Sequence, residues 1–370
     1  MGPRPPVTGW DAALSFIITM LKLTDHSLLQ HNTFGINVRC ARYVELESVE
    51  EACHFFPADF QPVFVIGGGS NLLFTNDYPG TIVRSAIRGI TVSTQTDGKG
   101  GSEPDILVRA GSGEAWDHLV DYCTAHDWHG LENLSLIPGD VGASAVQNIG
   151  AYGSEAADTI VSVEAVDTAT GKTVIIPAAD CGYGYRQSRF KTDWRARYFI
   201  THVTYRLSAH FQPRLDYGNL RAVLRQRSIG DQPTASQLRQ AVIDIRREKL
   251  PDPEVTGNAG SFFMNPIVSR QHYERLAAKY PQMPSYPVGG RASGSDNDEG
   301  QVKLAAGWLI DQCGWKGRTL GPAGVHDRQA LVLVNRGGAT GDDILALCRA
   351  IQHDVRERFD IELKPEVLIV

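Results

Sequence analysis

The stretch Ile137–Gly153 constrains this chain more than any other part of its sequence. It carries four glycines, Gly139, Gly142, Gly150 and Gly153. Backbone without Cβ atoms allows a ligand to approach closely and can present several N–H groups along one concave arc. Pro138-Gly139 predicts a turn, and Asp140 is placed to cap a short helix whose free amides would face an anion. No Walker lysine follows, so a nucleoside triphosphate loop is not indicated, and a purely structural glycine loop is the alternative.

A second glycine loop, Gly67–Asn71, lies upstream. It follows the apolar run Val63–Ile66, which predicts a buried strand that ends in backbone amides suited to a pyrophosphate. The spacing is not that of a Rossmann fold, because Leu72 stands where the third glycine would be, and Asn76–Gly80 breaks the chain before any long helix. Two such loops predict a dinucleotide held by a different fold.

Composition sets limits on the kind of protein. A length of 370 residues suggests two or three domains, and a net charge of −6 offers no electrostatic footprint for nucleic acid. The six cysteines contain no C-x-x-C pair and are expected to be buried thiols, while the 11 histidines show no metal-ligand spacing. The N-terminal apolar run 12–23 is too short to span a bilayer, so we expect a cytoplasmic protein with no metal and no membrane partner.

Periodicity and turn residues predict alternating strands and helices after an N-terminal extension of residues 1–30. Helices are expected at 48–56 with Ser48 as cap, 114–126, 236–249 with Ser236 as cap, 269–280, 303–313, and from a capping box at Thr340 and Asp343 to about 359. Strands are expected at 63–66, 81–83, 106–108, 161–166, 173–176, 198–200, 202–207 and 330–334, loops at 96–103 and 289–300, and an extended segment at 364–370.

Three residues far apart in the sequence have surroundings suited to chemistry. Arg186 lies beside tyrosine and glycine and could grip a carboxylate or phosphate with two hydrogen bonds; a surface arginine stacked on tyrosine is the alternative. Ser261 follows a small-residue turn without a G-x-S-x-G motif, so it would be a proton donor only toward a strong base such as a carbanion, or else a turn serine. Glu366 lies among apolar residues, where its pKa would rise unless it meets a cation such as Arg186, or it is an exposed acid at a frayed end.

These residues resemble the UDP-N-acetylenolpyruvoylglucosamine reductases, flavoenzymes of peptidoglycan precursor synthesis. The resemblance runs from 32–34 to 365–367 and is carried by motifs at 67–71, 130–134, 137–139, 147–153, 184–186, 257–263 and 306–310. Residues 216–220 are similar to the tyrosine loop of the longer, type I branch. The resemblance implies an α+β fold, in which a two-part FAD-binding domain of the vanillyl-alcohol-oxidase (PCMH) type is joined to a smaller α+β substrate-binding domain.

The implied domains follow one another along the chain. They are the extension 1–30, the FAD-binding domain 31–208, the tyrosine loop and connecting helix 209–250, the substrate-binding domain 251–357, and a C-terminal segment 358–370 that returns to the active site.

The resemblance also implies a reaction. NADPH would reduce non-covalent FAD and leave, and hydride would pass from N5 to C3 of UDP-N-acetylglucosamine enolpyruvate, with a proton from Ser261 to C2, to give UDP-N-acetylmuramate. Arg186 and Glu366 would polarise the enolpyruvyl carboxylate. FAD is expected at Gly67, Gly68, Gly69, Ser70, Asn71, Pro138, Gly139, Gly142, Ala143, Ser144, Gln147, Asn148, Gly150, Ala151, Gly153 and Arg186. The UDP diphosphate and sugar are expected at Tyr217, Lys249, Asn265, Lys316 and Gln329, in a monomer.

Two departures and two alternatives accompany this hypothesis. Many relatives carry arginine two positions beyond the glutamate, where this chain has Leu368, and the segments 1–30 and 289–300 lie outside the shared pattern. An FAD-linked alcohol or sugar oxidase of the same fold is one alternative, although such oxidases often tether flavin through a histidine near the first loop, and 67–71 contains none. A nucleotide-sugar-binding protein without catalysis is the other.

Overall fold

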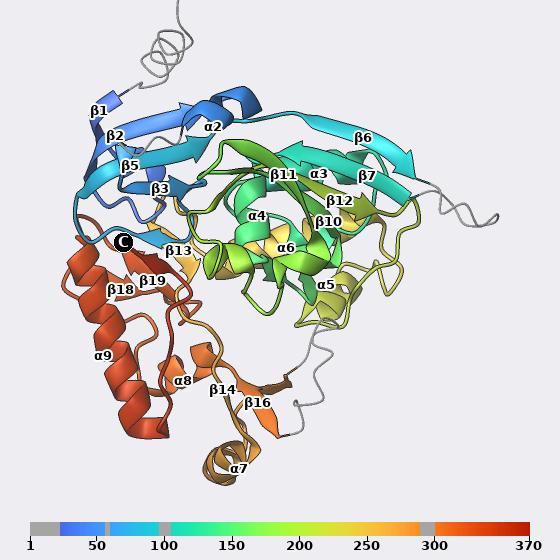
Figure 1. Ribbon diagram of the computed structural model, residues 1–370. Coiled ribbons are helices and arrows are strands. Elements are labelled where there is room, and N and C mark those ends of the chain that lie inside the picture. Colours follow the sequence, from blue (N-terminus) through green and yellow to red (C-terminus); the bar gives the residue numbers. More distant parts are fainter. Residues whose placement is uncertain (1–22, 56–59, 96–104, 289–299) are drawn as a thin grey trace, which may run out of the picture. The chain divides into compact units, whose positions relative to one another are not determined.

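The computed structural model describes residues 23–55, 60–95, 105–288 and 300–370 (Figure 1). These residues form two compact units that interleave along the chain. The first unit consists of the chain up to His26, Arg39–Gly68 and Tyr78–Val242. The second unit consists of Ser27–Val38, Gly69–Asp77 and Ile243–Val370. The division falls within a helix rather than at the expected Pro-rich boundary after residue 250. The functional domain limits stay a prediction.

The first unit contains a sheet in the order β1 (Leu23–Ser27), β2 (Arg39–Leu46), β5 (Tyr78–Ser85), β3 (Val63–Ile66), in which β2 and β3 run parallel to β5. Helix α2 (Val49–Phe55) begins after Ser48, whose Oγ accepts a hydrogen bond from the Glu51 amide at 3.1 Å, so the predicted cap is confirmed. Two expectations were wrong. Residues 23–27 belong to the sheet rather than to an extension, and β3 is an edge strand rather than a buried one, with Val65 37% exposed.

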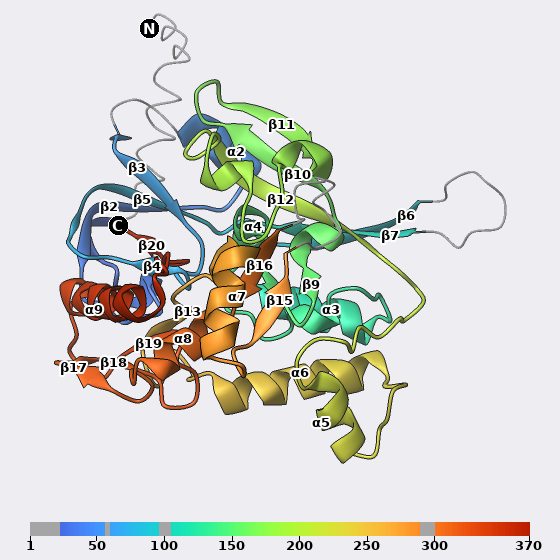
Figure 2. The same ribbon diagram turned by 90° about the horizontal axis from the view of Figure 1, so that it is seen from below.

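A second, antiparallel sheet has the order β11 (Lys172–Pro177), β10 (Ile160–Asp167), β12 (Tyr198–Leu207), β7 (Asp105–Gly111), β6 (Ile90–Gln95). Figure 2 shows β6 and β7 running side by side. The two strands predicted at 198–200 and 202–207 are one continuous strand, β12. A short turn after Asp167 joins β10 to β11, where Asp167 pairs with Lys172.

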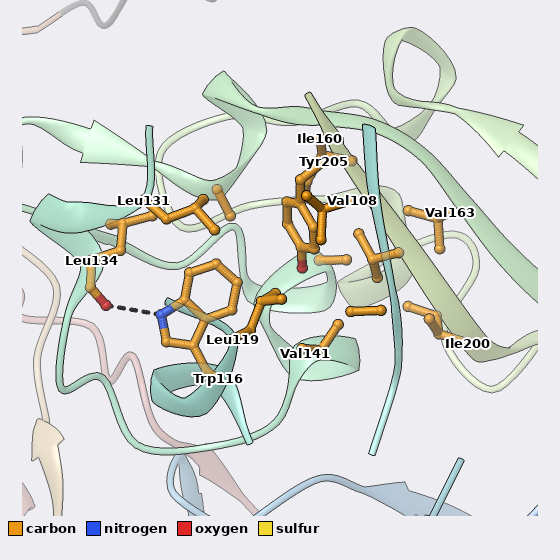
Figure 3. Packing of buried hydrophobic residues seen from close by; sticks show 14 of the residues in the cluster. Val108, Trp116, Leu119, Leu131, Leu134, Val141, Ile160, Val163, Ile200 and Tyr205 are labelled. Atoms are coloured by element: carbon orange, nitrogen blue, oxygen red, sulfur yellow. Dashed lines mark hydrogen bonds between the residues drawn. The ribbon is translucent and has the colours of Figure 1, made fainter. Parts of the chain in front are cut away.

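Helices α3 (Trp116–Ala125) and α4 (Val141–Gln147) supply the core of this sheet. Figure 3 shows Trp116 among Leu119, Leu131 and Leu134, with Tyr205 and Val141 in the same cluster. The Trp116 indole Nε1–H donates a hydrogen bond to the Leu134 carbonyl at 2.8 Å. A buried indole N–H needs a hydrogen-bond acceptor. This bond therefore holds the backbone at Leu134, which leads into the Ile137–Gly153 stretch.

The second unit is built on the antiparallel sheet β13 (Asn258–Ser261), β19 (Val332–Asn335), β18 (Ala323–Val325), β17 (Thr319–Leu320). Helix α9 (Gly341–Phe359) packs beside β18 and β19, next to α8 (Ala306–Gln312) (Figure 1). The predicted capping box of α9 is confirmed, since the Asp343 amide donates to Thr340 Oγ1 at 3.2 Å and the Thr340 amide donates to Asp343 Oδ2 at 2.8 Å.

Smaller elements complete the fold. A three-stranded sheet has the order β14 (Ile267–Ser269), β16 (Gln301–Leu304), β15 (Ser285–Pro287), next to α7 (Arg270–Lys279), and β20 (Leu368–Ile369) runs parallel to β4 (Leu72–Leu73) (Figure 2). The remaining elements are β8 (Gly150–Ala151), β9 (Ser154–Glu155), α5 (Leu220–Gln226), α6 (Ala235–Lys249) and the 3-10 turns at 29–31, 132–134, 156–158, 178–181 and 189–191. The helix expected from 303 begins only at Ala306, because Val302 and Leu304 alternate into the core as strand residues.

Four cysteines are buried, as expected, whereas Cys53 and Cys313 are only partly buried. Burial raises the pKa of Cys123 and of Cys348 to about 12. None of the helices formed by the described residues combines the length and the apolar character needed to cross a membrane. The loops expected at 96–103 and 289–300 lie outside the described residues, apart from Gly300, which forms a turn.

The N-terminal cap of α6 supplies a test of these assignments. Thr234 and not Ser236 is the cap, since the Gln237 amide donates to Thr234 Oγ1 at 3.2 Å. We expect Thr234→Ala to lower the free energy of unfolding by about 1 kcal/mol, since a helix amide loses its acceptor. Ser236→Ala, at an exposed position within the helix, is the matched control and should leave it nearly unchanged. Urea denaturation measures both; equal effects would overturn the cap assignment.

Candidate functional site

The two glycine loops lie against each other within the first unit. A Cβ built on Gly68 would stand 3.2 Å from Gly139 Cα, and one built on Gly67 would stand 3.3 Å from Ala143 Cβ. Both separations are tighter than ordinary Cβ contacts, so Gly68 meets the backbone of Gly139 and Gly67 meets the Ala143 side chain. Glycine loops that approach each other this closely are suited to phosphate groups, and the residues fit a dinucleotide cofactor such as FAD.

Asp140 does not act as predicted. It occupies the N-cap position of α4, but its carboxylate accepts no hydrogen bond from the helix amides. The Val141 and Gly142 amides instead donate to the Glu114 and Ser112 carbonyls at 2.8 and 2.9 Å, so these amides are not free to bind an anion. The carboxylate turns toward the first glycine loop, where Arg84 Nη2 lies 3.6 Å from Asp140 Oδ2. The guanidinium thus replaces the helix amides as its partner.

Two residues expected to contact the cofactor have buried side chains that form hydrogen bonds within the protein. Ser144 is 1% exposed, and its hydroxyl lies 2.7 Å from the Tyr205 hydroxyl. Asn148 is 1% exposed, and its Nδ2 donates to the Gly184 carbonyl and to Glu155 Oε2 at 2.8 Å each. Both side chains are thus engaged within the protein, and their expected contact with FAD stays a prediction.

Arg186 is held in a tight turn on the central stretch. Gly184 and Gln187 exchange backbone hydrogen bonds, and Arg186 between them has a φ of +55°, a left-handed conformation unusual for arginine. Its Nη2 donates to the Gly150 carbonyl at 2.7 Å, while Lys191 Nζ donates to the Arg186 carbonyl at 3.1 Å. The predicted arginine is therefore anchored to the predicted cofactor loop. Lys191 is a supporting residue that the sequence motifs did not reveal.

Tyr217 lies directly on the same stretch. A Cβ built on Gly153 would stand 3.3 Å from Tyr217 Cβ, and Gly153 has a φ of +78°, so both space and conformation require glycine there. Asn133 Nδ2 donates to the Tyr152 and Arg214 carbonyls at 2.9 Å each and ties the tyrosine loop to the central stretch. The first unit thus gathers Arg186, Gly150–Gly153 and Tyr217 in one place, with the Tyr217 side chain 47% exposed.

In the second unit, tertiary pairing brings the C-terminal segment beside the strand that carries Ser261. The Glu366 amide donates to the Phe262 carbonyl at 2.8 Å, and Phe263 and Pro365 form an antiparallel bridge. Asn71 Nδ2 donates to the Glu366 carbonyl at 3.2 Å. Glu366 is therefore partly buried and held on both sides, so the alternative of an exposed acid at a frayed end is wrong.

The departure at Leu368 has a structural role. Its amide donates to the Asn71 carbonyl at 3.0 Å, and its strand β20 pairs with β4, which follows the first glycine loop. Thr33 adds a second tie, because its Oγ1 donates to the Asn258 carbonyl at 2.6 Å and its amide donates to the Gly69 carbonyl at 3.2 Å. Asn71, Ser261 and Glu366 are thus fixed relative to one another by backbone hydrogen bonds.

The other expected substrate residues of this unit have mixed surroundings. Arg328 Nη1 donates to the Glu248 carbonyl at 2.8 Å, which brings the loop before Gln329 to the end of the helix that carries Lys249. The Asn265 side-chain carbonyl accepts from the Ala306 amide at 3.0 Å at the start of α8. Lys316 Nζ lies 3.9 Å from Asp311 Oδ2 in a largely exposed pair.

The expected pairing of Arg186 with Glu366 stays a prediction, because Arg186 belongs to the first unit and Glu366 to the second. Within the described residues, no group of three or more histidine, cysteine, aspartate or glutamate side chains could hold a metal ion.

Comparison with known proteins assigns the chain to a family. Residues 252–370 match the family described as UDP-N-acetylenolpyruvoylglucosamine reductase, C-terminal domain, and residues 41–176 match a family described as FAD binding domain. A UDP-N-acetylenolpyruvoylglucosamine reductase of Bacteroides fragilis is 52% identical over 346 residues, which cover 92% of this chain and 98% of that protein. The chain belongs to the UDP-N-acetylenolpyruvoylglucosamine reductase family.

Further comparisons agree with this family. The reductase of the same name from Burkholderia vietnamiensis is 49% identical over 98% of this chain and 99% of its own length. The crystal structure of UDP-N-acetylenolpyruvylglucosamine reductase from Thermus caldophilus has the same fold, with a TM-score of 0.61 at 23% identity over 92% of this chain and 96% of that one. The predicted α+β fold with an FAD-binding domain of the vanillyl-alcohol-oxidase type is confirmed, and the family favours a reductase over the alternative oxidase.

The contact between the glycine loops can be tested by adding side chains to Gly68. Gly68→Val should force the loops apart and lower the affinity of the apoprotein for FAD at least about fivefold, because a single buried clash costs about 1–3 kcal/mol. Gly68→Ala, with one methyl group, is the graded control and should lose less. Quenching of flavin fluorescence measures the affinity. If Gly68→Val bound FAD normally while its melting temperature was unchanged, the loop would not be part of the cofactor site.

Proposed function

We propose that this chain reduces UDP-N-acetylglucosamine enolpyruvate to UDP-N-acetylmuramate with NADPH, as a UDP-N-acetylmuramate dehydrogenase of peptidoglycan precursor synthesis. Family membership supports the substrate class, and the matched FAD binding domain supports the cofactor. The observation that carries the residue assignments is the pairing of the Ser261 strand with the C-terminal segment through the Glu366 amide and the Phe262 carbonyl. It pairs the backbone of the segment that carries Glu366 with the chain directly after Ser261, although the two segments are far apart in the sequence.

The glycine loops are the proposed holders of the FAD diphosphate. Backbone amides of Gly67, Gly68 and Gly139 suit this role, because they lie where the two loops of the first unit approach each other. When bound, FAD would supply the chemistry of hydride transfer from NADPH to C3 of the enolpyruvyl ether. We propose non-covalent binding, since the first loop contains no histidine.

Ser261 is the proposed proton donor to C2. Arrival of hydride at C3 pushes negative charge onto C2 and its carboxylate, which creates a base strong enough to take a proton from a serine hydroxyl. Ser261 lies at the end of β13, where pairing with Val332 fixes its backbone. A fixed backbone limits the positions that the hydroxyl can reach. The proton donor is therefore oriented before the reaction.

Arg186 and Glu366 are the proposed partners of the substrate carboxylate. Arg186 Nη2 donates a hydrogen bond to the Gly150 carbonyl, and this bond orients the planar guanidinium. The other N–H groups of a guanidinium are suited to bind a carboxylate. Glu366 is held by its own backbone amide and carbonyl. A fixed donor such as the Arg186 guanidinium at the site of developing charge lowers the barrier by about 3 kcal/mol in typical enzymes.

The Ser261→Ala variant tests the proton-donor role. We expect flavin reduction by NADPH to stay nearly normal, since no proton is delivered to C2 in that half-reaction. Reoxidation by UDP-N-acetylglucosamine enolpyruvate should slow by about 10²-fold or more, as general acids typically contribute. Stopped-flow absorbance of the flavin separates the two steps, and Ser236→Ala is the matched control. Equal losses in both half-reactions would remove the assignment.

Tyr217→Ala tests the tyrosine loop as a substrate contact. The exposed ring lies on Gly153, so its removal should raise the KM for the enolpyruvyl substrate several-fold while leaving the flavin absorption spectrum unchanged. Tyr217→Phe retains the ring and shows how much of the effect belongs to the hydroxyl. A loss of bound flavin in Tyr217→Ala would instead assign the loop to the cofactor.

A further inference from the structure

An ion pair lies behind the two glycine loops of the first unit. Ideal Cβ positions on Gly67 and Gly68 lie 3.6 Å from Asp140 Oδ2 and 3.4 Å from Asp140 Oδ1, so each carboxylate oxygen faces one glycine of the first loop. Asp140 itself follows Gly139 of the second loop. The carboxylate is therefore enclosed by the same backbone that is proposed to hold a diphosphate.

This carboxylate is deeply buried and has few partners. Asp140 is 8% exposed, and its Oδ2 makes no hydrogen bond within the described part of the chain. Arg84 Nη2, at 3.6 Å from that oxygen, is the cation paired with it. A buried charge is tolerated only when an opposite charge compensates it, so the arginine is needed to keep Asp140 ionised in this place.

Arg84 is itself fixed by the neighbouring strand. Its Nη1 lies 3.4 Å from Glu45 Oε1, and the same Glu45 oxygen accepts a hydrogen bond from the Tyr43 hydroxyl at 2.7 Å. The side chain of Arg84 is 26% exposed, and it rises from β5 next to β2. This arrangement holds the guanidinium between Glu45 and Asp140.

We propose that Arg84 is a positioning residue that neutralises the buried Asp140 carboxylate between the glycine loops, and that FAD binding depends on this neutralisation. The diphosphate of FAD is anionic, and an uncompensated carboxylate behind the loops would repel it through a poorly solvated region where charges interact strongly. The ion pair removes that repulsion and holds the two loops together. The inference rests on the proposed role of the glycine loops as the diphosphate site.

The charge of Asp140 gives the inference a pH signature. Burial raises the pKa of the Asp140 carboxyl, and Arg84 acts against this rise. The other charged groups that influence it are Arg88, which follows β5, and Glu45 of β2. Loss of Arg84 must therefore raise the pKa of Asp140 further, and protonation at low pH would remove the repulsion.

Affinity of the full-length apoprotein for FAD, measured by quenching of flavin fluorescence, tests the proposal. Arg84→Met should raise the Kd at least about tenfold at pH near 8, and the ratio to wild type should shrink as the pH falls toward about 5.5. The double variant Arg84→Met/Asp140→Asn, which removes both charges, should recover most of the affinity. Arg88→Met is the matched control: it removes the same charge from an exposed arginine near Asp140 and should change the Kd less than threefold.

The outcomes separate this inference from the proposed function. If the double variant bound FAD no better than Arg84→Met, or if the loss did not depend on pH, Arg84 would act by packing alone and the inference would be wrong. If Arg84→Met bound FAD as Arg88→Met does, while Gly68→Val lost FAD, the loops would hold the cofactor without help from the pair. If the wild-type apoprotein did not bind FAD, or if Gly68→Val bound FAD as tightly as wild type, the glycine loops would not be the diphosphate site. The proposed role of the loops would then be wrong, whatever Arg84 does.

Discussion

The close approach of two backbone loops, around Gly68 and Gly139, is the constraint on which the first unit depends. Gly68 lies so close to the backbone of Gly139 that an added side chain would clash, so the position of the second loop requires a glycine there. Because glycines have no side chains to pack together, other residues must hold the two loops in place. The buried contact of Ser144 in α4 with Tyr205, the Trp116 bond to Leu134 and the Arg84–Asp140 pair supply that support.

The second unit solves a different problem, the placement of the last residues of the chain. A C-terminus is usually poorly ordered unless it is tied down. Here the Val370 carbonyl accepts from the Thr75 amide at 2.9 Å, and Glu366 is bonded on one side to Phe262 and on the other to Asn71. Three segments distant in sequence therefore share one ladder of backbone bonds, and an acid near the end of the chain becomes a positioned residue.

Side chains other than the proposed catalytic ones carry much of the precision of both sites. Lys191 and Asn148 hold the turn around Arg186, Asn133 ties the tyrosine loop to the central stretch, and Thr33 joins the first glycine loop to the strand of Ser261. Each acts through a backbone carbonyl rather than through another functional side chain. Such bonds leave no signature in residue spacing, so a motif search cannot find them, although a satisfied backbone is what keeps the turn at Arg186 in its left-handed conformation.

The sequence alone determined the local elements and the chemistry of the candidate residues. Helix caps at Ser48 and at Thr340 with Asp343, the strands β7, β10, β11 and β12 of the five-stranded sheet, and the glycine loops followed from local rules that depend on a few neighbouring residues. Local rules failed where a distant group competed. The Asp140 carboxylate pairs with Arg84 and does not cap its helix, and Lys303 lies in a strand and not in the predicted helix. The Glu366 amide near the end of the chain bonds to the Phe262 carbonyl. Only the tertiary structure decided these, because burial and long-range hydrogen bonding outweigh propensities of less than about 1 kcal/mol per residue.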